Sequence, residues 1–209
     1  EGKYYNDEDI REPINSITSL WMCLLSIVGL YSRGYISKEI QALYILQFVC
    51  GFGSSLFHLG LHKGWQCVDE ISMILLVVFG YKIFNDKLMD FYKNKMTDTI
   101  YYLTNTMYTF ILCFYGIYTM IICSIDDDHT KFRDLFTGVF MVLIFQILFI
   151  TYQINNQIIK IHIYYMFWIT VSGSLLWVFD EKLCNQITYY LYLHSFWHIL
   201  IGISTVYLI

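Results

Sequence analysis

Charged residues are scarce in this sequence of 209 residues, at 14% of the chain. A soluble domain carries about 25% charged residues, so this content excludes an ordinary soluble domain. The sequence has one proline and no stretch rich in Gly, Ser or Pro, which excludes an interdomain linker. No CxxC pair occurs among the six cysteines, which excludes a thiolate zinc motif. What remains is a chain that is 57% hydrophobic and needs lipid as its solvent.

Seven apolar segments are long enough to cross a bilayer, which takes roughly 20 residues. They cover residues 13–31, 38–59, 66–85, 99–123, 134–155, 161–179 and 187–209. They lack the two-residue alternation of membrane strands, and an open sheet would leave its edge groups unpaired in lipid. We therefore expect an all-α integral membrane bundle of seven transmembrane helices. Residues 1–209 would form a single domain, with 1–12 as an acidic N-terminal segment.

The basic residues give a weak preference for one orientation. An odd number of spans puts the two ends of the chain on opposite sides of the membrane. Four lysines surround the third connection and favour a cytosolic C-terminal side: Lys82, Lys87, Lys93 and Lys95. We therefore expect a lumenal N-terminus. The chain begins at Glu1 without a cleavable signal and ends in an apolar run, so we expect both ends to be trimmed.

Three histidines inside these spans are candidate metal ligands. His194 and His198 are four residues apart, which stacks two imidazoles on one face of a helix, as metal sites require. Two histidines bonded to neighbouring helices are the alternative. His58 closes the second span, and Ser54 lies one turn before it on the same face. Taken alone, His58 is better explained by a structural role than by metal binding.

The topology predicts that these side chains meet. The second span ends, and the third and seventh begin, on the N-terminal side of the membrane. His58, the two histidines of the seventh span and Asp69 at the start of the third can therefore lie at one depth. Three neutral histidines and a water make a catalytic zinc site, and a nearby carboxylate can take the proton of that water. Asp180 ends the sixth span on the same side. Its carboxylate would either accept a hydrogen bond from a ligand imidazole or be solvated at the helix end.

Four blocks of sequence carry these residues in order. The first is Ile10-Arg-Glu12-Pro-Ile-Asn15-Ser-Ile-Thr-Ser19, and the second is Gly53-Ser54-Ser-Leu-Phe-His58 with Asp69-Glu70 after it. The third is Trp177-Val-Phe-Asp180-Glu-Lys-Leu-Cys184, and the last is Leu193-His194-Ser-Phe-Trp197-His198-Ile-Leu-Ile-Gly202. Together they cover nearly the whole chain and resemble the alkaline ceramidase family. That family lies within a superfamily that includes adiponectin and progestin receptors and Per1-like proteins.

The resemblance implies a function and a role for each matching residue. His58, His194 and His198 match zinc ligands, whereas Ser54 and Asp69 match a catalytic serine and aspartate. The implied enzyme is a zinc-dependent hydrolase of linear amides that cleaves ceramide, a membrane lipid, to a sphingoid base and a free fatty acid. Asp69 would move the proton, and Ser54 and the zinc would stabilise the oxyanion. An endoplasmic reticulum or Golgi membrane is the expected location.

The resemblance also implies a calcium site and a disulfide bond. Glu1, Lys3 and Glu12 match positions of the family's calcium motif, although Lys3 would offer only its backbone carbonyl. A solvated acidic segment is the alternative. The family has a cysteine immediately before the position of Glu1, and we expect the natural chain to bond it to Cys184. A free thiol at Cys184 is the alternative.

Two other functions stay open at this point, the first of them within the same superfamily. One is a receptor or signalling protein with a structural zinc, which would not need Ser54 and Asp69. Another is a hydrolase of a different acyl lipid, such as an ester. The sequence gives no reason to expect a nucleic-acid partner or an obligate protein partner.

Overall fold

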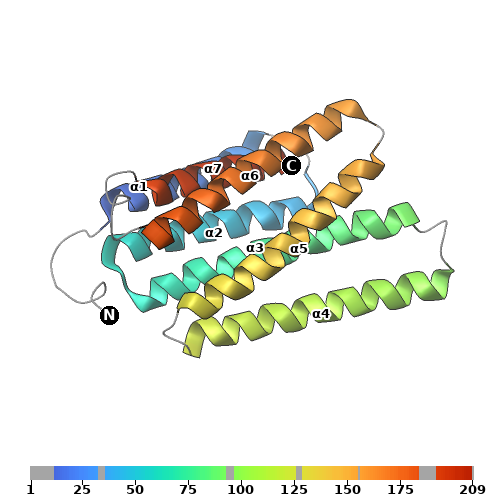
Figure 1. The fold of residues 1–209 in the computed structure, drawn as a ribbon, viewed down its shortest axis with the longest axis horizontal. Helices are drawn as coiled ribbons and strands as arrows, with labels where there is room; N and C mark the ends of the chain where they lie inside the picture. Colours follow the sequence, from blue (N-terminus) through green and yellow to red (C-terminus); the bar gives the residue numbers. More distant parts are fainter. Residues whose placement is uncertain are drawn as a thin grey trace. The chain divides into compact units, whose positions relative to one another are not determined.

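The described part of the chain is almost entirely helical. A computed structural model describes residues 12–32, 36–92, 97–125, 129–154, 156–183 and 192–208. The helices in these ranges are α1 (Pro13–Ser32), α2 (Lys38–Gly60), α3 (Lys63–Tyr92), α4 (Asp98–Ile125), α5 (His129–Gln153), α6 (Gln157–Leu183) and α7 (Leu193–Leu208) (Figure 1). Each apolar segment of the sequence corresponds to one of them, so the all-α prediction is confirmed.

Five of these helices are long and apolar enough to cross a membrane. They are α1, α2 and the segments 101–122, 131–149 and 157–180 of α4, α5 and α6. Helix α7 has 16 described residues. Helix α3 runs to Tyr92, through most of the connection predicted after residue 85, and Lys82 pairs with Asp86 one turn later along it at 2.6 Å. A membrane protein is thus supported, and seven spans stay a prediction.

The chain divides into two compact units, one from residues 1–72 and 161–209 and the other from residues 73–160. In the second unit, the Tyr115 hydroxyl of α4 donates to the Leu135 carbonyl of α5 at 2.6 Å. Asn85 of α3 donates to Asn105 of α4 at 3.3 Å. Polar side chains therefore link the helices of this unit. The single domain that we expect from the sequence stays a prediction.

Helix α1 is the centre of the first unit, because both α2 and α7 pack against it (Figure 1). Its buried face consists of small or flexible side chains: Ser16, Ser19, Met22, Cys23, Ser26 and Gly29. Small residues let helix backbones approach closely in lipid. A Cβ atom on Gly51 of α2 would lie 2.7 Å from the Ser19 carbonyl oxygen, so this contact requires glycine. The other face of α1 exposes Ile17, Leu20 and Leu24, as lipid contact requires.

Candidate metal centre

His58 lies in the last turn of α2, and local backbone geometry brings the start of α3 to the same end. Leu61 ends the helix in the left-handed conformation, with a φ of 52°, and its N–H donates to the Phe57 carbonyl at 2.6 Å. The chain reverses within this turn and α3 begins at Lys63. Asp69 therefore lies in the second turn of α3, at the end of the helix pair that carries His58.

The structure brings the three predicted ligands together. One ring nitrogen from each of His58, His194 and His198 lies within 4.8 Å of the other two. The ring centroids are 5.0 Å apart for His58 and His194, 5.2 Å for His58 and His198, and 4.7 Å for the α7 pair. His58 and His198 are buried. Three imidazoles at these distances are a donor set of the kind that binds zinc.

The hydrogen bonds of His58 leave one ring nitrogen available for a metal. Its Nδ1 donates to Glu12 Oε2 at 2.6 Å, and among the described residues its buried Nε2 has no hydrogen-bond partner. Burial raises the pKa of the Glu12 carboxyl, but the hydrogen bond and charge of His58 oppose this effect, and the net result is a pKa lowered to about 2. Because Nδ1 is the nitrogen that faces the Glu12 carboxylate, the neutral imidazole that a metal requires carries its proton there and keeps its lone pair on Nε2.

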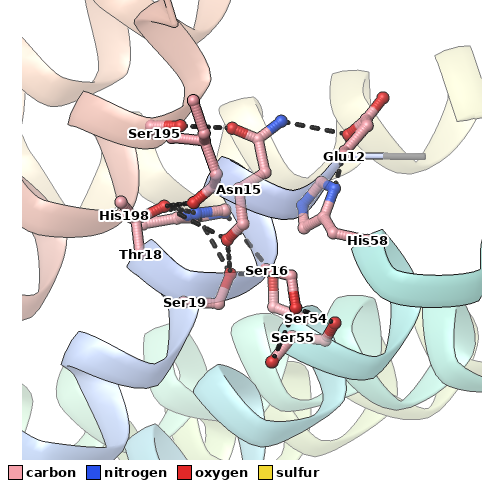
Figure 2. A network of polar contacts seen from close by, with 11 residues as sticks. Glu12, Asn15, Ser16, Thr18, Ser19, Ser54, Ser55, His58, Ser195 and His198 are labelled. Carbon is pink, nitrogen blue, oxygen red and sulfur yellow. Dashed lines mark hydrogen bonds and ion pairs between the residues drawn. The ribbon is translucent and has the colours of Figure 1, made fainter. Parts of the chain in front are cut away.

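His198 is held in the same tautomer by two hydroxyl groups of α1 (Figure 2). The Thr18 hydroxyl donates to the Ile14 carbonyl at 2.9 Å, and the Ser19 hydroxyl donates to the Asn15 carbonyl at 2.8 Å. Their single protons are thus in use, so both oxygens accept from His198 Nδ1, at 3.2 and 3.1 Å. Nε2 of His198 is left with its lone pair, as a metal ligand requires.

Ser54 and Asp69 lie beside this cluster. The Ser54 Oγ is 3.4 Å from His198 Nε2 and 3.2 Å from Ser19 Oγ, and the residue is 2% exposed. The Asp69 carboxylate accepts from the Cys50 thiol of α2 at 3.5 Å. The Ser54 side chain therefore lies where a group bound between the histidines could contact it, and Asp69 lies against the same helix as Ser54.

Sequence reasoning missed the polar groups of α1 that support the ligands. The Asn15 amide donates to Glu12 Oε2 at 3.0 Å and accepts from the Ser195 hydroxyl of α7, so it joins the partner of His58 to α7 (Figure 2). Ser16 donates to the Ser55 carbonyl of α2 at 2.9 Å. The available signal was the set of polar residues three and four apart within an apolar span, which is typical of a face buried between helices.

Several predicted site residues cannot be compared with the geometry. Glu1, Lys3 and Cys184 lie outside the described residues. Glu12 is therefore the one member of the expected calcium set that the structure describes. One of its carboxylate oxygens accepts from both His58 and Asn15. Asp180 is partly buried near the end of α6. Three residues before it, Trp177 stacks on Trp197 of α7 with ring centroids 5.4 Å apart, which joins the third sequence block to the last.

Comparison with known proteins agrees with these features. The chain is 22% identical to alkaline ceramidase 1 of Mus musculus over an alignment of 224 residues. The alignment covers 98% of this chain and 74% of that protein. It is 25% identical to a Dictyostelium discoideum protein named "Putative alkaline ceramidase dcd3A" over 237 residues, 98% of this chain and 81% of that one. The family model described as Ceramidase matches residues 1–209. The chain therefore belongs to the ceramidase family.

Proposed function

We propose that this protein is a zinc-dependent intramembrane amidohydrolase that cleaves ceramide to a sphingoid base and a free fatty acid. The observation that supports it most is the three-histidine cluster, in which the buried Nε2 of His58 has no hydrogen-bond partner within the described part of the chain. An imidazole held by a carboxylate through Nδ1 is the usual arrangement of a zinc ligand. Membership of the ceramidase family supports the lipid amide as the substrate.

The donor set fits a catalytic zinc ion. His58, His194 and His198 would hold it, and three nitrogen ligands leave a fourth position open. When bound, the ion supplies a Lewis acid for the amide carbonyl and a water whose pKa is about 7. The remaining chemistry falls to the protein's own side chains.

Asp69 and Ser54 are the residues we propose for that chemistry. Asp69 takes a proton from the attacking water and delivers it to the leaving amine nitrogen as the C–N bond breaks. The products are then the free amine of the sphingoid base and the carboxyl group of the fatty acid. The Ser54 hydroxyl donates to the carbonyl oxygen as negative charge develops on it. Its distance of 3.4 Å from His198 Nε2 supports this role.

Metal analysis combined with a lipid-cleavage assay tests the proposal. We expect about one zinc per chain in detergent-purified protein, as a single donor set implies, and release of a sphingoid base from ceramide by mass spectrometry. His194→Ala should lose most of the zinc, whereas His162→Ala, at an exposed position of α6, should keep it. Full zinc retention in His194→Ala contradicts the three-histidine site. Zinc binding with cleavage of an ester lipid only, or of neither lipid, contradicts the ceramide assignment.

We also propose calcium binding by Glu1, Lys3 and Glu12, a disulfide between Cys184 and a cysteine preceding Glu1, and a lumenal N-terminus in the endoplasmic reticulum or Golgi. Disulfides persist in that compartment, so one measurement bears on two of these proposals. The experiment is mass mapping of a longer, non-reduced and alkylated protein. A bridged Cys184 supports both the bond and the orientation, whereas an alkylated Cys184 contradicts them.

A further inference from the structure

Gln47 is a fully buried amide in the middle of α2 to which the chemistry above assigns no role. Its side chain is 0% exposed, and Nε2 donates to the backbone carbonyl of Gly202 on α7 at 3.3 Å. Its buried Oε1 has no hydrogen-bond partner in the described structure. A buried acceptor without a partner destabilises the fold, and a methionine of similar length would avoid this cost. The N–H contact with α7 is therefore the feature that explains an amide at this position.

The contact joins the two helices that carry the histidines. Gln47 lies eleven residues before His58, which returns it to the same face of α2 about 16 Å along the axis. Gly202 follows His198 by one turn, about 6 Å along α7. A displacement of α7 relative to α2 would therefore change both this hydrogen bond and the separation of the ligand nitrogens.

Helices α1, α2 and α7 come close together at this level. A Cβ atom would lie 2.8 Å from Met22 of α1 if placed on Gly51 of α2, and 3.4 Å from Met22 if placed on Gly202. Because α2 and α7 each pack mainly against α1, a long side chain is needed to link them directly. Ser54 also reaches α7, but its contact uses His198 Nε2, the atom that a metal would take. The Gln47 contact involves no ligand atom and can persist when metal binds.

We propose that Gln47 is a positioning residue that ties α2 to α7 and sets the separation of His58 from His194 and His198. The inference rests on the proposed function, because it takes these three histidines as the zinc ligands. The distances from a metal ion to its ligand atoms vary by only about 0.2 Å, so two helices that move independently would bind the ion weakly. A link one turn away from His198 restricts that motion before the metal arrives.

Substitution of Gln47 by methionine, with cobalt(II) in place of zinc, tests this role. Gln47→Met keeps the length of the side chain and removes the donor. The matched control is Gln41→Met, because Gln41 is an exposed amide of the same helix that donates to the nearby Ile36 carbonyl at 3.2 Å. We expect Gln47→Met to bind zinc about tenfold more weakly, at the low end for groups that orient ligands. Its cobalt absorption bands should shift, whereas those of the control should not.

An unchanged cobalt spectrum and zinc affinity in folded Gln47→Met would overturn the proposal. Gln47→Asn provides a second variant, because it keeps an amide but is one methylene too short for Gly202. A wild-type spectrum in that variant would also overturn it, and so would failure of both variants to fold while Gln41→Met stays intact. Wild-type protein that binds cobalt without cleaving ceramide contradicts the proposed function, and the comparison of spectra still decides the role of Gln47.

Discussion

Glu12 offers the most direct test of how the candidate zinc site is built. The Nδ1 of His58 donates to its carboxylate at 2.6 Å, and the His58 side chain is 5% exposed. A hydrogen bond to a charged group contributes about 1.5–3 kcal/mol, and the 36% exposure of the Glu12 side chain places it at the lower end. Glu12→Gln keeps an acceptor but removes the charge, so we expect zinc affinity to fall about tenfold, since about 1.4 kcal/mol corresponds to a factor of ten. Glu12→Ala leaves the buried Nδ1 unpaired, and we expect a loss nearer 100-fold.

The assay is a competition with a zinc chelator, run with calcium removed and again with calcium saturating. This arrangement separates the contact with His58 from any part that Glu12 plays in calcium binding. Glu39→Gln is the control, because Glu39 is an exposed carboxylate in the first turn at the opposite end of α2. Zinc affinity in Glu12→Ala equal to that of the control, under both calcium conditions, would refute the argument that this carboxylate orients His58.

Three further substitutions separate chemistry from packing. Asp69→Asn should keep its zinc and lose ceramide hydrolysis, because an amide cannot accept the proton; near-normal turnover would exclude Asp69 as the base. Ser54→Ala should lower the rate by roughly 10²–10³-fold with the metal content unchanged, and a smaller loss would exclude the oxyanion role. Gly51→Ala should destabilise the protein by about 1–3 kcal/mol in thermal unfolding, because its Cβ would lie 2.7 Å from the Ser19 carbonyl oxygen. Gly64→Ala is the control, since a Cβ there meets nothing within 4 Å, and equal stability of the two would contradict the predicted clash.

The helices were predictable because lipid requires long apolar segments, and the convergence of the histidines was predictable from topology. Spacing alone placed His194 and His198 on one face, and the shared membrane side brought His58 to them. The ends of α3 were less accessible to this reasoning. The charged segment after residue 85 predicts a connection, whereas α3 continues to Tyr92, with Lys82 and Asp86 paired one turn apart on it.

The supporting groups of the site could not be predicted from the sequence, because their roles depend on which atoms face each other across helices. Thr18 and Ser19 look like ordinary small polar residues of a membrane helix. Only the geometry shows that both contact His198 Nδ1. Gln47 is similar, since its partner is the backbone carbonyl of Gly202, and a backbone atom leaves no signature in the sequence.

The support of His198 by α1 has a consequence for the biogenesis of the protein. Ser19 and His198 are 179 positions apart in the chain, and residues 73–160 form a separate unit between them. Insertion into a membrane follows the order of synthesis, so the hydroxyl groups of α1 are in place long before α7 reaches them. The three-histidine cluster is therefore complete only after α7 has packed against α1. Until α7 is made, the Thr18 and Ser19 hydroxyl groups of α1 are without the imidazole that they contact in the folded chain.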